Sequence, residues 1–357
     1  MRSTTSIEKI ESVVICPGCL CELLIDYDQC LIYRTEQNAL STMPTHIVTC
    51  NQCEIKFAIP RFSPTEIDQL YKKGGFWKTH SKNIFTAQKA PGQFMQSSIR
   101  WRYIIQNSEN KVFDILDVGA GYGFIGQAAY HTPRRRLNSY TVVEKDEYFL
   151  ESLQMTWDQN FPQIKFKAYS DLTHVEGKFN IIVLSHVLEH VVNPRDYLRQ
   201  VNNLLDRKGI LYIEVPFLDY QYKGDFFPHL LFFDPQSLRN LCESSGFRVI
   251  SVRSFGKSKE KSPINYKNQK RIDVRLFNLF KDASRDRSKV KNENIRLVSG
   301  NKGKIKSRLL ELVALINRKR LFKKFAPWKT YGKIISFYYG FKKQKIDGTW
   351  IRLIASK

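Results

Sequence analysis

Three glycines between residues 119 and 123 form the sequence feature best suited to bind a ligand. Gly119, Gly121 and Gly123 follow a short apolar run and precede a helical pattern. Because side chains at these positions would keep a ligand away from the backbone, their absence lets an adenosyl group lie on the turn, near the helix N-terminus. Glu144 ends the next apolar run, where a carboxylate can accept hydrogen bonds from both hydroxyls of a ribose.

The same glycines permit two other interpretations. Gly121, Gly123 and Gly126 satisfy the dinucleotide-binding pattern G-x-G-x-x-G, and a tight turn without any ligand is also possible. Asp117, two residues before the first glycine, favours a ligand with a cationic end. S-adenosylmethionine carries an amino group and a sulfonium and has no pyrophosphate, so we predict it as the cofactor.

Two Cys-x-x-Cys pairs near the N-terminus predict a metal site. With 30 residues between the pairs, four thiolates can surround a zinc ion tetrahedrally. The predicted ligands are Cys16, Cys19, Cys50 and Cys53. We expect a structural zinc, because four thiolates leave no open position for catalysis. Cys21 is an alternative to Cys19, a redox-active pair without metal is the competing interpretation, and Cys30 and Cys242 are predicted to be ordinary thiols.

Histidines occupy positions where ligands bind in open α/β sheets. His186, His190 and His229 lie on segments that should converge at the carboxyl ends of the strands. Methyl transfer needs the acceptor aligned with the sulfonium, and a hydroxyl or acidic carbon also needs a general base, usually histidine. We therefore predict these three residues as catalytic candidates. The competing interpretations are a helix-start hydrogen-bond network for Glu189 and His190, and packing for His229.

Strand-like and helix-like segments alternate through the middle of the chain. The expected strands are 113–118, 140–143, 164–167, 181–185, 210–215 and 249–252. The expected helices are 94–105, 123–130, 148–157, 194–205 and 235–244. Gly209 and Gly246 are expected in turns or at helix ends. This alternation predicts an α/β fold with a parallel, doubly wound, Rossmann-like sheet.

The motifs of this region together resemble those of class I methyltransferases, in the branch that acts on small molecules and sugars. They are Asp117-x-Gly119-x-Gly121-x-Gly123, 184–191, 204–216, 229–238 and 245–247. The resemblance covers about 112–252 and implies an S-adenosylmethionine-dependent methyltransferase. It also implies a seven-stranded sheet with an antiparallel last strand, for which residues 350–354 fit.

The resemblance also suggests roles for individual residues. It implies that Asp171 and Leu172 lie near the adenine, and that Ser185 and His186 flank the methyl group and the acceptor. Sugar-nucleotide C-methyltransferases of similar architecture carry a Glu-His pair where this chain has Pro228-His229, so the histidine matches and the glutamate does not. A similar zinc ribbon precedes the catalytic domain in several carbohydrate and natural-product methyltransferases.

Positive charge is concentrated in the C-terminal part of the chain. The formal net charge is +23, and residues 251–357 hold 30 Lys+Arg against 7 Asp+Glu, so the first 250 residues are neutral. Such a segment is expected to meet nucleic acid, an anionic membrane surface or an anionic glycan. A solvated insertion without a specific partner is the competing interpretation.

These features predict four parts. They are a zinc-binding ribbon (1–75), a helical connector (76–111), a methyltransferase domain (112–256 and 345–357) and a basic, partly helical insertion (257–344). Within the insertion, Ile305, Leu309, Leu312, Val313 and Ile316 recur at helical spacing. No secretory signal and no apolar run of the ~18–20 residues of a membrane span are visible. We expect a cytoplasmic protein, peripheral at a membrane surface if the insertion binds one.

We predict a methyltransferase whose acceptor is a small molecule or glycan-linked, such as a nucleotide sugar or saccharide precursor. Transfer would be an in-line displacement with His-assisted deprotonation. A second hypothesis is an RNA methyltransferase that grips the phosphate backbone with ribbon and insertion. Residues 185–188 lack the Asn/Asp-Pro-Pro-aromatic motif of enzymes that methylate base amines. A third is a non-catalytic nucleic-acid or membrane-surface binding protein on this fold, and the last is a dehydrogenase.

Overall fold

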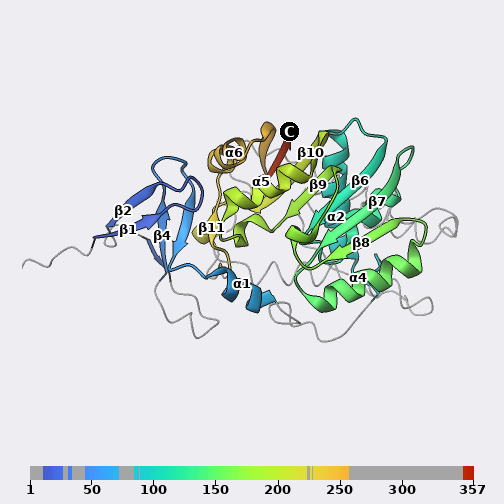
Figure 1. Cartoon of the computed structure of the whole chain (residues 1–357), viewed down its shortest axis with the longest axis horizontal. Helices are drawn as coiled ribbons and strands as arrows, with labels where there is room; N and C mark the ends of the chain where they lie inside the picture. The colour runs from blue at the N-terminus through green and yellow to red at the C-terminus, as the bar shows by residue number, and fades with distance from the viewer. Residues whose placement is uncertain are drawn as a thin grey trace, which may run out of the picture. The chain divides into compact units, whose positions relative to one another are not determined.

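A seven-stranded sheet forms the centre of the computed structural model, which describes residues 11–26, 31–33, 45–71, 84–87, 89–222, 226, 228–256 and 349–357. The strand order is β12-β13-β10-β9-β6-β7-β8 (Figure 1). In chain order the strands are β6 (Val112–Val118), β7 (Arg136–Val143), β8 (Lys165–Tyr169), β9 (Phe179–Ser185), β10 (Leu205–Pro216), β12 (Arg248–Phe255) and β13 (Trp350–Ser356).

The direction of the strands confirms the predicted fold class. Strands β6 to β10 pair in parallel, whereas β13 runs antiparallel to both β10 and β12. The central strands β6 and β9 are apolar along most of their length because both faces of such a sheet are covered. Ile115, Leu116, Ile182 and Leu184 on these two strands are fully buried.

Five helices of the described chain lie between or before these strands. They are α2 (Pro91–Gln106), α3 (Phe124–Tyr130), α4 (Glu147–Asn160), α5 (Pro194–Leu204) and α6 (Pro235–Ser244). Proline begins α2, α5 and α6, where its missing N–H costs no hydrogen bond. Asp146 caps α4 and Asp234 forms a capping box at α6. Helix α4 packs against β8, and α6 against β12.

Gly209 does not lie in a turn, so that prediction was wrong. It lies within β10, where the register with β9 shifts between Leu205 and Ile210. A Cβ at Gly209 would lie 2.8 Å from Leu205 Cδ1 and 3.0 Å from the carbonyl oxygen of Phe179. Glycine is required there for close packing. Gly246, in contrast, follows α6 with a φ of +91°, which suits the end of a helix.

The N-terminal module contains two small sheets. Strands β1 (Glu11–Ile15) and β2 (Glu22–Asp26) form a hairpin. The second sheet has the order β11-β5-β4-β3, with β3 (Leu31–Tyr33), β4 (Thr45–Thr49), β5 (Lys56–Ile59) and β11 (Leu231–Phe232). Strand β11 follows β10 in the chain, far from the N-terminal residues in sequence, and lies beside the N-terminal strands in Figure 1. The module is therefore joined to the segment that directly follows His229.

Helix α1 (Pro64–Tyr71) follows this module and begins with a reciprocal pair of hydrogen bonds. The Ser63 amide donates to Glu66 Oε2 at 2.7 Å, and the Glu66 amide donates to Ser63 Oγ at 3.3 Å. This reciprocal pair satisfies two amides that the first turn of a helix leaves open.

The basic insertion 257–344, with its predicted helical segment, lies outside the described residues, as does Cys30. Among the residues that are described, no helix is both long enough and apolar enough to cross a membrane.

Candidate functional site

The glycine turn leaves an open backbone surface at Gly121. Gly119, Gly121 and Gly123 have φ values of +67°, +51° and +66°. A Cβ at Gly119 would lie 2.5 Å from Val187 Cγ2, and one at Gly123 would lie 2.5 Å from Leu153 Cδ2. At Gly121, no heavy atom of the described neighbours lies within 4 Å of the Cβ position. Packing therefore requires the outer two glycines, whereas the middle one borders space that a ligand can occupy.

Two buried carboxylates flank this turn. Glu144 Oε2 accepts a hydrogen bond from the Gly121 amide at 2.9 Å, and Glu144 Oε1 accepts one from the Asp146 amide at 3.3 Å. Burial raises the pKa of Glu144 despite these donors. Asp117 Oδ2 accepts from the Tyr140 hydroxyl at 2.6 Å, and burial raises the pKa of Asp117 to about 7. A ligand that supplies hydroxyl donors and a positive charge would stabilise the ionised form of both acids and lower their pKa values.

Asp171, Leu172 and Ser185 lie at the same edge of the sheet, after β8 and β9. Asp171 Oδ1 accepts from the backbone amide and the hydroxyl of Thr173, at 2.9 and 2.7 Å, and caps the short 3₁₀ helix η3 (Leu172–His174). The side chain of Leu172 is buried. Ser185 ends β9 in register with Glu214.

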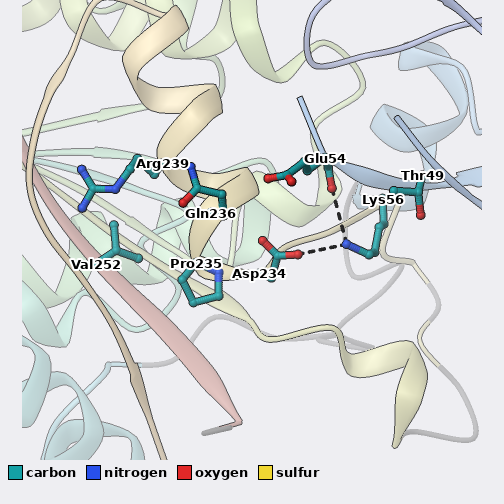
Figure 2. Close-up of a pocket in the computed structure, with 8 residues that line it drawn as sticks. All are labelled: Thr49, Glu54, Lys56, Asp234, Pro235, Gln236, Arg239 and Val252. Atoms are coloured by element: carbon teal, nitrogen blue, oxygen red, sulfur yellow. Dashed lines mark hydrogen bonds and ion pairs between the residues drawn. The ribbon is translucent and has the colours of Figure 1, made fainter. Parts of the chain in front are cut away.

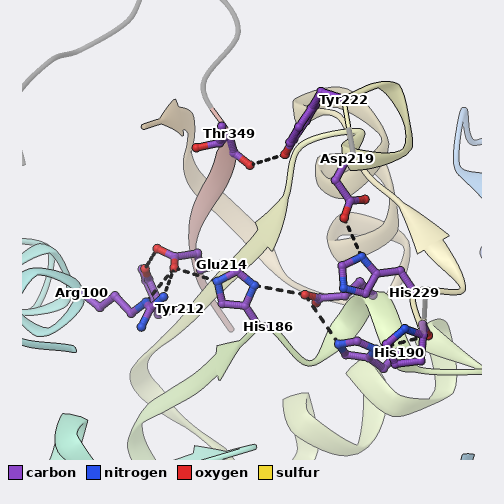
Figure 3. A network of polar contacts seen from close by, with 11 residues as sticks. Arg100, His186, His190, Tyr212, Glu214, Asp219, Tyr222, His229 and Thr349 are labelled. Atoms are coloured by element: carbon purple, nitrogen blue, oxygen red, sulfur yellow. Dashed lines mark hydrogen bonds and ion pairs between the residues drawn. The ribbon is translucent and has the colours of Figure 1, made fainter. Parts of the chain in front are cut away.

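His186 is held between two carboxylates (Figure 3). Its backbone has a φ of +58°, which non-glycine residues rarely adopt outside functional or strained sites. Nδ1 lies 3.2 Å from Glu189 Oε1, and Nε2 lies 3.3 Å from Glu214 Oε1. Burial alone would lower the pKa of His186, but these two hydrogen bonds outweigh it and raise the pKa. With both ring nitrogens engaged, this ring is suited to hold the loop in place.

Sequence reasoning missed the network around Glu214. Arg100 from α2 approaches Glu214 Oε1 at 2.6 Å, and Arg352 from β13 donates to Oε2 at 2.5 Å. The Tyr212 hydroxyl also donates to Oε2, at 2.8 Å. The one available signal was a charged residue inside each of two apolar strand patterns, at 214 and 352, and nothing in the sequence paired them.

His190 and His229 present a different arrangement from His186. His190 Nδ1 lies 3.4 Å from the Pro228 carbonyl, and the two rings meet edge to face with centroids 4.8 Å apart. Burial lowers the pKa of His190 to about 4, so the ring is neutral. His229 Nδ1 lies 2.7 Å from Asp219 Oδ2, an ion-pair contact although not an aligned hydrogen bond. Asp219 belongs to no motif and was also missed.

Comparison with known families now identifies the chain. The model of a methyltransferase domain family, Methyltransf_23, matches residues 59–252. The chain belongs to this family. It is an S-adenosylmethionine-dependent methyltransferase, with the sheet and the glycine turn described above.

Solved structures with similar folds include further methyltransferases. One, an S-adenosylmethionine-dependent methyltransferase from Clostridium acetobutylicum ATCC 824, has 11% identity and a TM-score of 0.37, over 45% of this chain and 82% of that one. Magnesium protoporphyrin IX methyltransferase from Synechocystis PCC 6803 has 14% identity and a TM-score of 0.41, over 55% and 94%. An Archaeoglobus fulgidus enzyme has 15% identity and a TM-score of 0.40, over 76% and 97%. No protein of curated function matches.

The N-terminal module of the methyltransferase brings the four predicted cysteines together. Cys16, Cys19, Cys50 and Cys53 offer sulfur atoms that all lie within 4.8 Å of one another. Cys16 Sγ is 3.6 Å from Cys53 Sγ, and Cys19 Sγ is 3.5 Å from Cys50 Sγ. Cys21 Sγ adds a fifth sulfur, 3.3 Å from Cys19 and 3.5 Å from Cys50.

The turns that carry these cysteines are equivalent. The amide two residues after Cys16 donates to its sulfur at 3.3 Å, and the amide two residues after Cys50 does so at 3.4 Å. Leu20 and Glu54, each four residues after the first cysteine, have φ values of +66° and +62°. The hydrogen bond between Cys16 and Cys53 lowers the pKa of Cys16 to about 5 and raises the pKa of Cys53. The amides directed at sulfur in two equivalent turns fit a tetrahedral zinc site.

A separate pocket of the methyltransferase, about 510 Å³ in volume, contains none of the predicted site residues. Figure 2 shows the Lys56–Asp234 ion pair across it, at 2.9 Å, beside Arg239 and Gln236. Its mixed charges and open shape suit water better than a cofactor.

Proposed function

We propose that the enzyme methylates a small-molecule or glycan-linked acceptor, such as a nucleotide sugar or saccharide precursor, at an atom that loses a proton. The observation that carries this proposal is the 2.7 Å contact between His229 Nδ1 and Asp219 Oδ2, close to the sheet edge that bears the glycine turn. A histidine backed by a buried carboxylate is a general base of a familiar kind. An acceptor that is already a free nucleophile would not require one.

The cofactor would lie on the glycine turn. The open space at Gly121, the acceptor oxygens of Glu144 and the raised pKa of Asp117 fit an adenosyl ligand with a cationic amino acid end. When bound, S-adenosylmethionine supplies an activated methyl group, so the protein mainly aligns the acceptor. The proposed contacts are Asp117, Gly119, Gly121, Gly123, Glu144, Asp171, Leu172 and Ser185.

The three histidines would divide the work. His186, with both nitrogens held by carboxylates, would orient the loop and the acceptor. His229 would take the acceptor proton on Nε2 while Asp219 stabilises the resulting imidazolium. The methyl group would come from the sulfonium of a donor held by Asp117, Gly121 and Glu144, and the acceptor proton would go to His229. His190 is neutral, and its ring packs against that of His229.

We also propose that the four predicted cysteines hold a structural zinc ion, with Cys21 as a bystander. We retain the four parts predicted from the sequence, with the qualification that β11 joins the ribbon sheet across that boundary. The basic insertion would contact an anionic surface, either a membrane or phosphate groups of the acceptor.

Calorimetry with S-adenosylhomocysteine and with NAD tests the cofactor assignment. We expect binding of the first only, and its loss in Glu144→Ala, while Glu151→Ala on the exposed face of α4 keeps it. Binding of NAD alone would overturn the assignment.

Incubation with methyl-labelled S-adenosylmethionine and a panel of nucleotide sugars, saccharide lipids and RNA then tests the acceptor class. We expect label in a saccharide, and much less of it with His229→Gln. Label in RNA alone would favour an RNA methyltransferase instead.

A further inference from the structure

We propose that Glu189, His190 and His229 form a reversible site for a divalent transition-metal ion such as Zn²⁺, distinct from the cysteine cluster. Each of the three side chains offers a ligand atom, and these atoms all lie within 4.8 Å of one another. Two imidazoles and one carboxylate are a donor set that transition metals favour. The consequence for catalysis, described below, rests on the proposed function.

The Nε2 atoms of His190 and His229 are available for metal binding. A carbonyl oxygen only accepts hydrogen bonds, so His190 Nδ1, facing the Pro228 carbonyl, carries the ring proton. Asp219 Oδ2 lies 2.7 Å from His229 Nδ1, so a proton on this nitrogen would face a carboxylate, although the pair does not form an aligned hydrogen bond. With their protons on Nδ1, both rings would present the lone pair of Nε2. Metal-binding histidines are held in the same way by an oxygen on the other ring nitrogen.

Glu189 supplies an independent sign of a missing ligand. Its side chain is 1% exposed, and Oε1 is engaged by His186. Oε2 is buried and has no hydrogen-bond partner among the described residues. A buried carboxylate oxygen without a partner is costly. His190 Nε2 lies 3.9 Å from Oε1 of the same carboxylate. A cation bound beside His190 and held by both carboxylate oxygens would give Oε2 the partner that it lacks.

The spacing indicates a weaker site than the cysteine cluster. Tetrahedral zinc with bonds near 2.0 Å brings its nitrogen and oxygen ligands to roughly 3.3 Å from one another. His190 Nε2 and Glu189 Oε1, 3.9 Å apart, must therefore move together, whereas the sulfur pairs Cys16–Cys53 and Cys19–Cys50 already lie at 3.6 and 3.5 Å, near the separation that longer zinc–sulfur bonds require. Side-chain rotation can provide this movement at some cost in affinity. Occupancy would then follow the free metal concentration.

Metal and acceptor proton would compete for one lone pair. His229 Nε2 cannot bind Zn²⁺ and accept a proton at once, so metal binding would switch off the proposed base. Mg²⁺ and Ca²⁺, which prefer oxygen ligands, would not compete. The site would thus make methyl transfer sensitive to transition metals.

Equilibrium dialysis of protein that already holds one zinc per chain, against stepwise Zn²⁺ or Co²⁺, tests the site by counting bound metal. We expect a second equivalent, weakened at least tenfold in His229→Gln and in Glu189→Gln. Both variants should keep the first equivalent of zinc, and its retention shows that they are folded. His131→Gln, a histidine at the end of α3, is the matched control and keeps both. A count that stays at one, or a second equivalent that survives both substitutions, would refute the site.

Labelling by diethyl pyrocarbonate tests the competition for the lone pair. Zn²⁺ should protect His229 from modification, as read by peptide mass spectrometry, and Mg²⁺ should not. Equal labelling with and without Zn²⁺ would refute the competition. Titration with S-adenosylhomocysteine in the same samples separates the two proposals. Loss of cofactor binding contradicts the proposed function alone, whereas cofactor binding with a single metal contradicts the second site alone.

Discussion

At the scale of single residues, Glu214 joins parts of the chain that are far apart in sequence. It is 1% exposed and meets Arg100, Arg352, Tyr212 and His186. The two arginines hold the pKa of Glu214 well below its usual range although burial opposes this. The carboxylate therefore stays ionised and can hold the ring of His186. Helix α2, before the sheet, and β13, its last strand in the chain, thus both support the loop that carries His186.

Arg352→Met is expected to destabilise the protein by about 3 kcal/mol, because it removes one partner of a buried, charged network. The matched control is Arg253→Met, since Arg253 is the exposed neighbour of Arg352 on β12 and should cost less than about 0.5 kcal/mol. Urea unfolding measures both. Equal effects of the two substitutions would mean that the Glu214 network adds no stability.

Asp117 should make cofactor binding depend on pH. Its pKa is raised to about 7 by burial, so near pH 6 most of the carboxyl is protonated. A cationic ligand needs the ionised form and must displace this proton, so affinity should rise as pH rises through 7. We expect S-adenosylhomocysteine to bind about tenfold more tightly at pH 8 than at pH 6. Calorimetry should show this slope in the wild type and in Asp114→Asn, but a flat profile in Asp117→Asn.

At the scale of elements, two glycines of one turn are expected to have different roles, Gly123 in packing and Gly121 in cofactor binding. Gly121→Ala and Gly123→Ala both place a side chain at positive φ, which costs about 1–2 kcal/mol. Only Gly123→Ala also drives a Cβ into Leu153, for about 1–3 kcal/mol more. Gly123→Ala should therefore lower stability more, and Gly121→Ala should lose S-adenosylhomocysteine affinity while remaining folded. Thermal unfolding and calorimetry on both variants test this, and the reverse ranking would contradict it.

The elements that the sequence predicted are those with a strong local pattern. The apolar runs of β6 and β9 and the paired cysteines each depend on a few neighbouring residues, so the structure that they form can be predicted without knowledge of the fold. The two-residue strand β11 and the Arg100–Glu214–Arg352 network depend on contacts between distant segments. Gly209 was misplaced because a glycine required for close packing has the same sequence signature as one in a turn.

Loss of metal from the cysteine cluster is expected to destabilise β11 as well as the N-terminal strands. Phe57 on β5 pairs with Leu231 on β11, and the Ala58 amide donates to the Leu230 carbonyl at 2.9 Å. Small zinc modules lose their fold without metal, so the segment after His229 should lose protection together with β4 and β5. Hydrogen exchange on Cys50→Ser, with Cys242→Ser as control, measures this. Full protection of β11 in Cys50→Ser would show that the modules are independent.

At the scale of the whole molecule, the basic insertion can be removed without cutting the sheet. The segment to be removed, residues 257–348, consists of the insertion and the four residues after it, and it contains 27 Lys+Arg and 7 Asp+Glu. The strands on either side of it are neighbours, with Phe255 opposite Trp350. A short glycine–serine linker from Gly256 to Thr349 should therefore preserve β13 and cofactor binding. Retention on anionic vesicles should be lost, because nearly all of the net charge is gone.

A second variant distinguishes charge from shape. It keeps the length of the insertion but replaces its lysines by glutamine, so it should also lose retention on anionic vesicles if electrostatic attraction is responsible. The salt concentration that releases each protein is the measurement, because attraction between charges weakens as ions screen it. Vesicle binding that persists in the glutamine variant but not in the deletion would point to the apolar residues of the insertion. Binding that persists in both would place the contact on the neutral part of the enzyme.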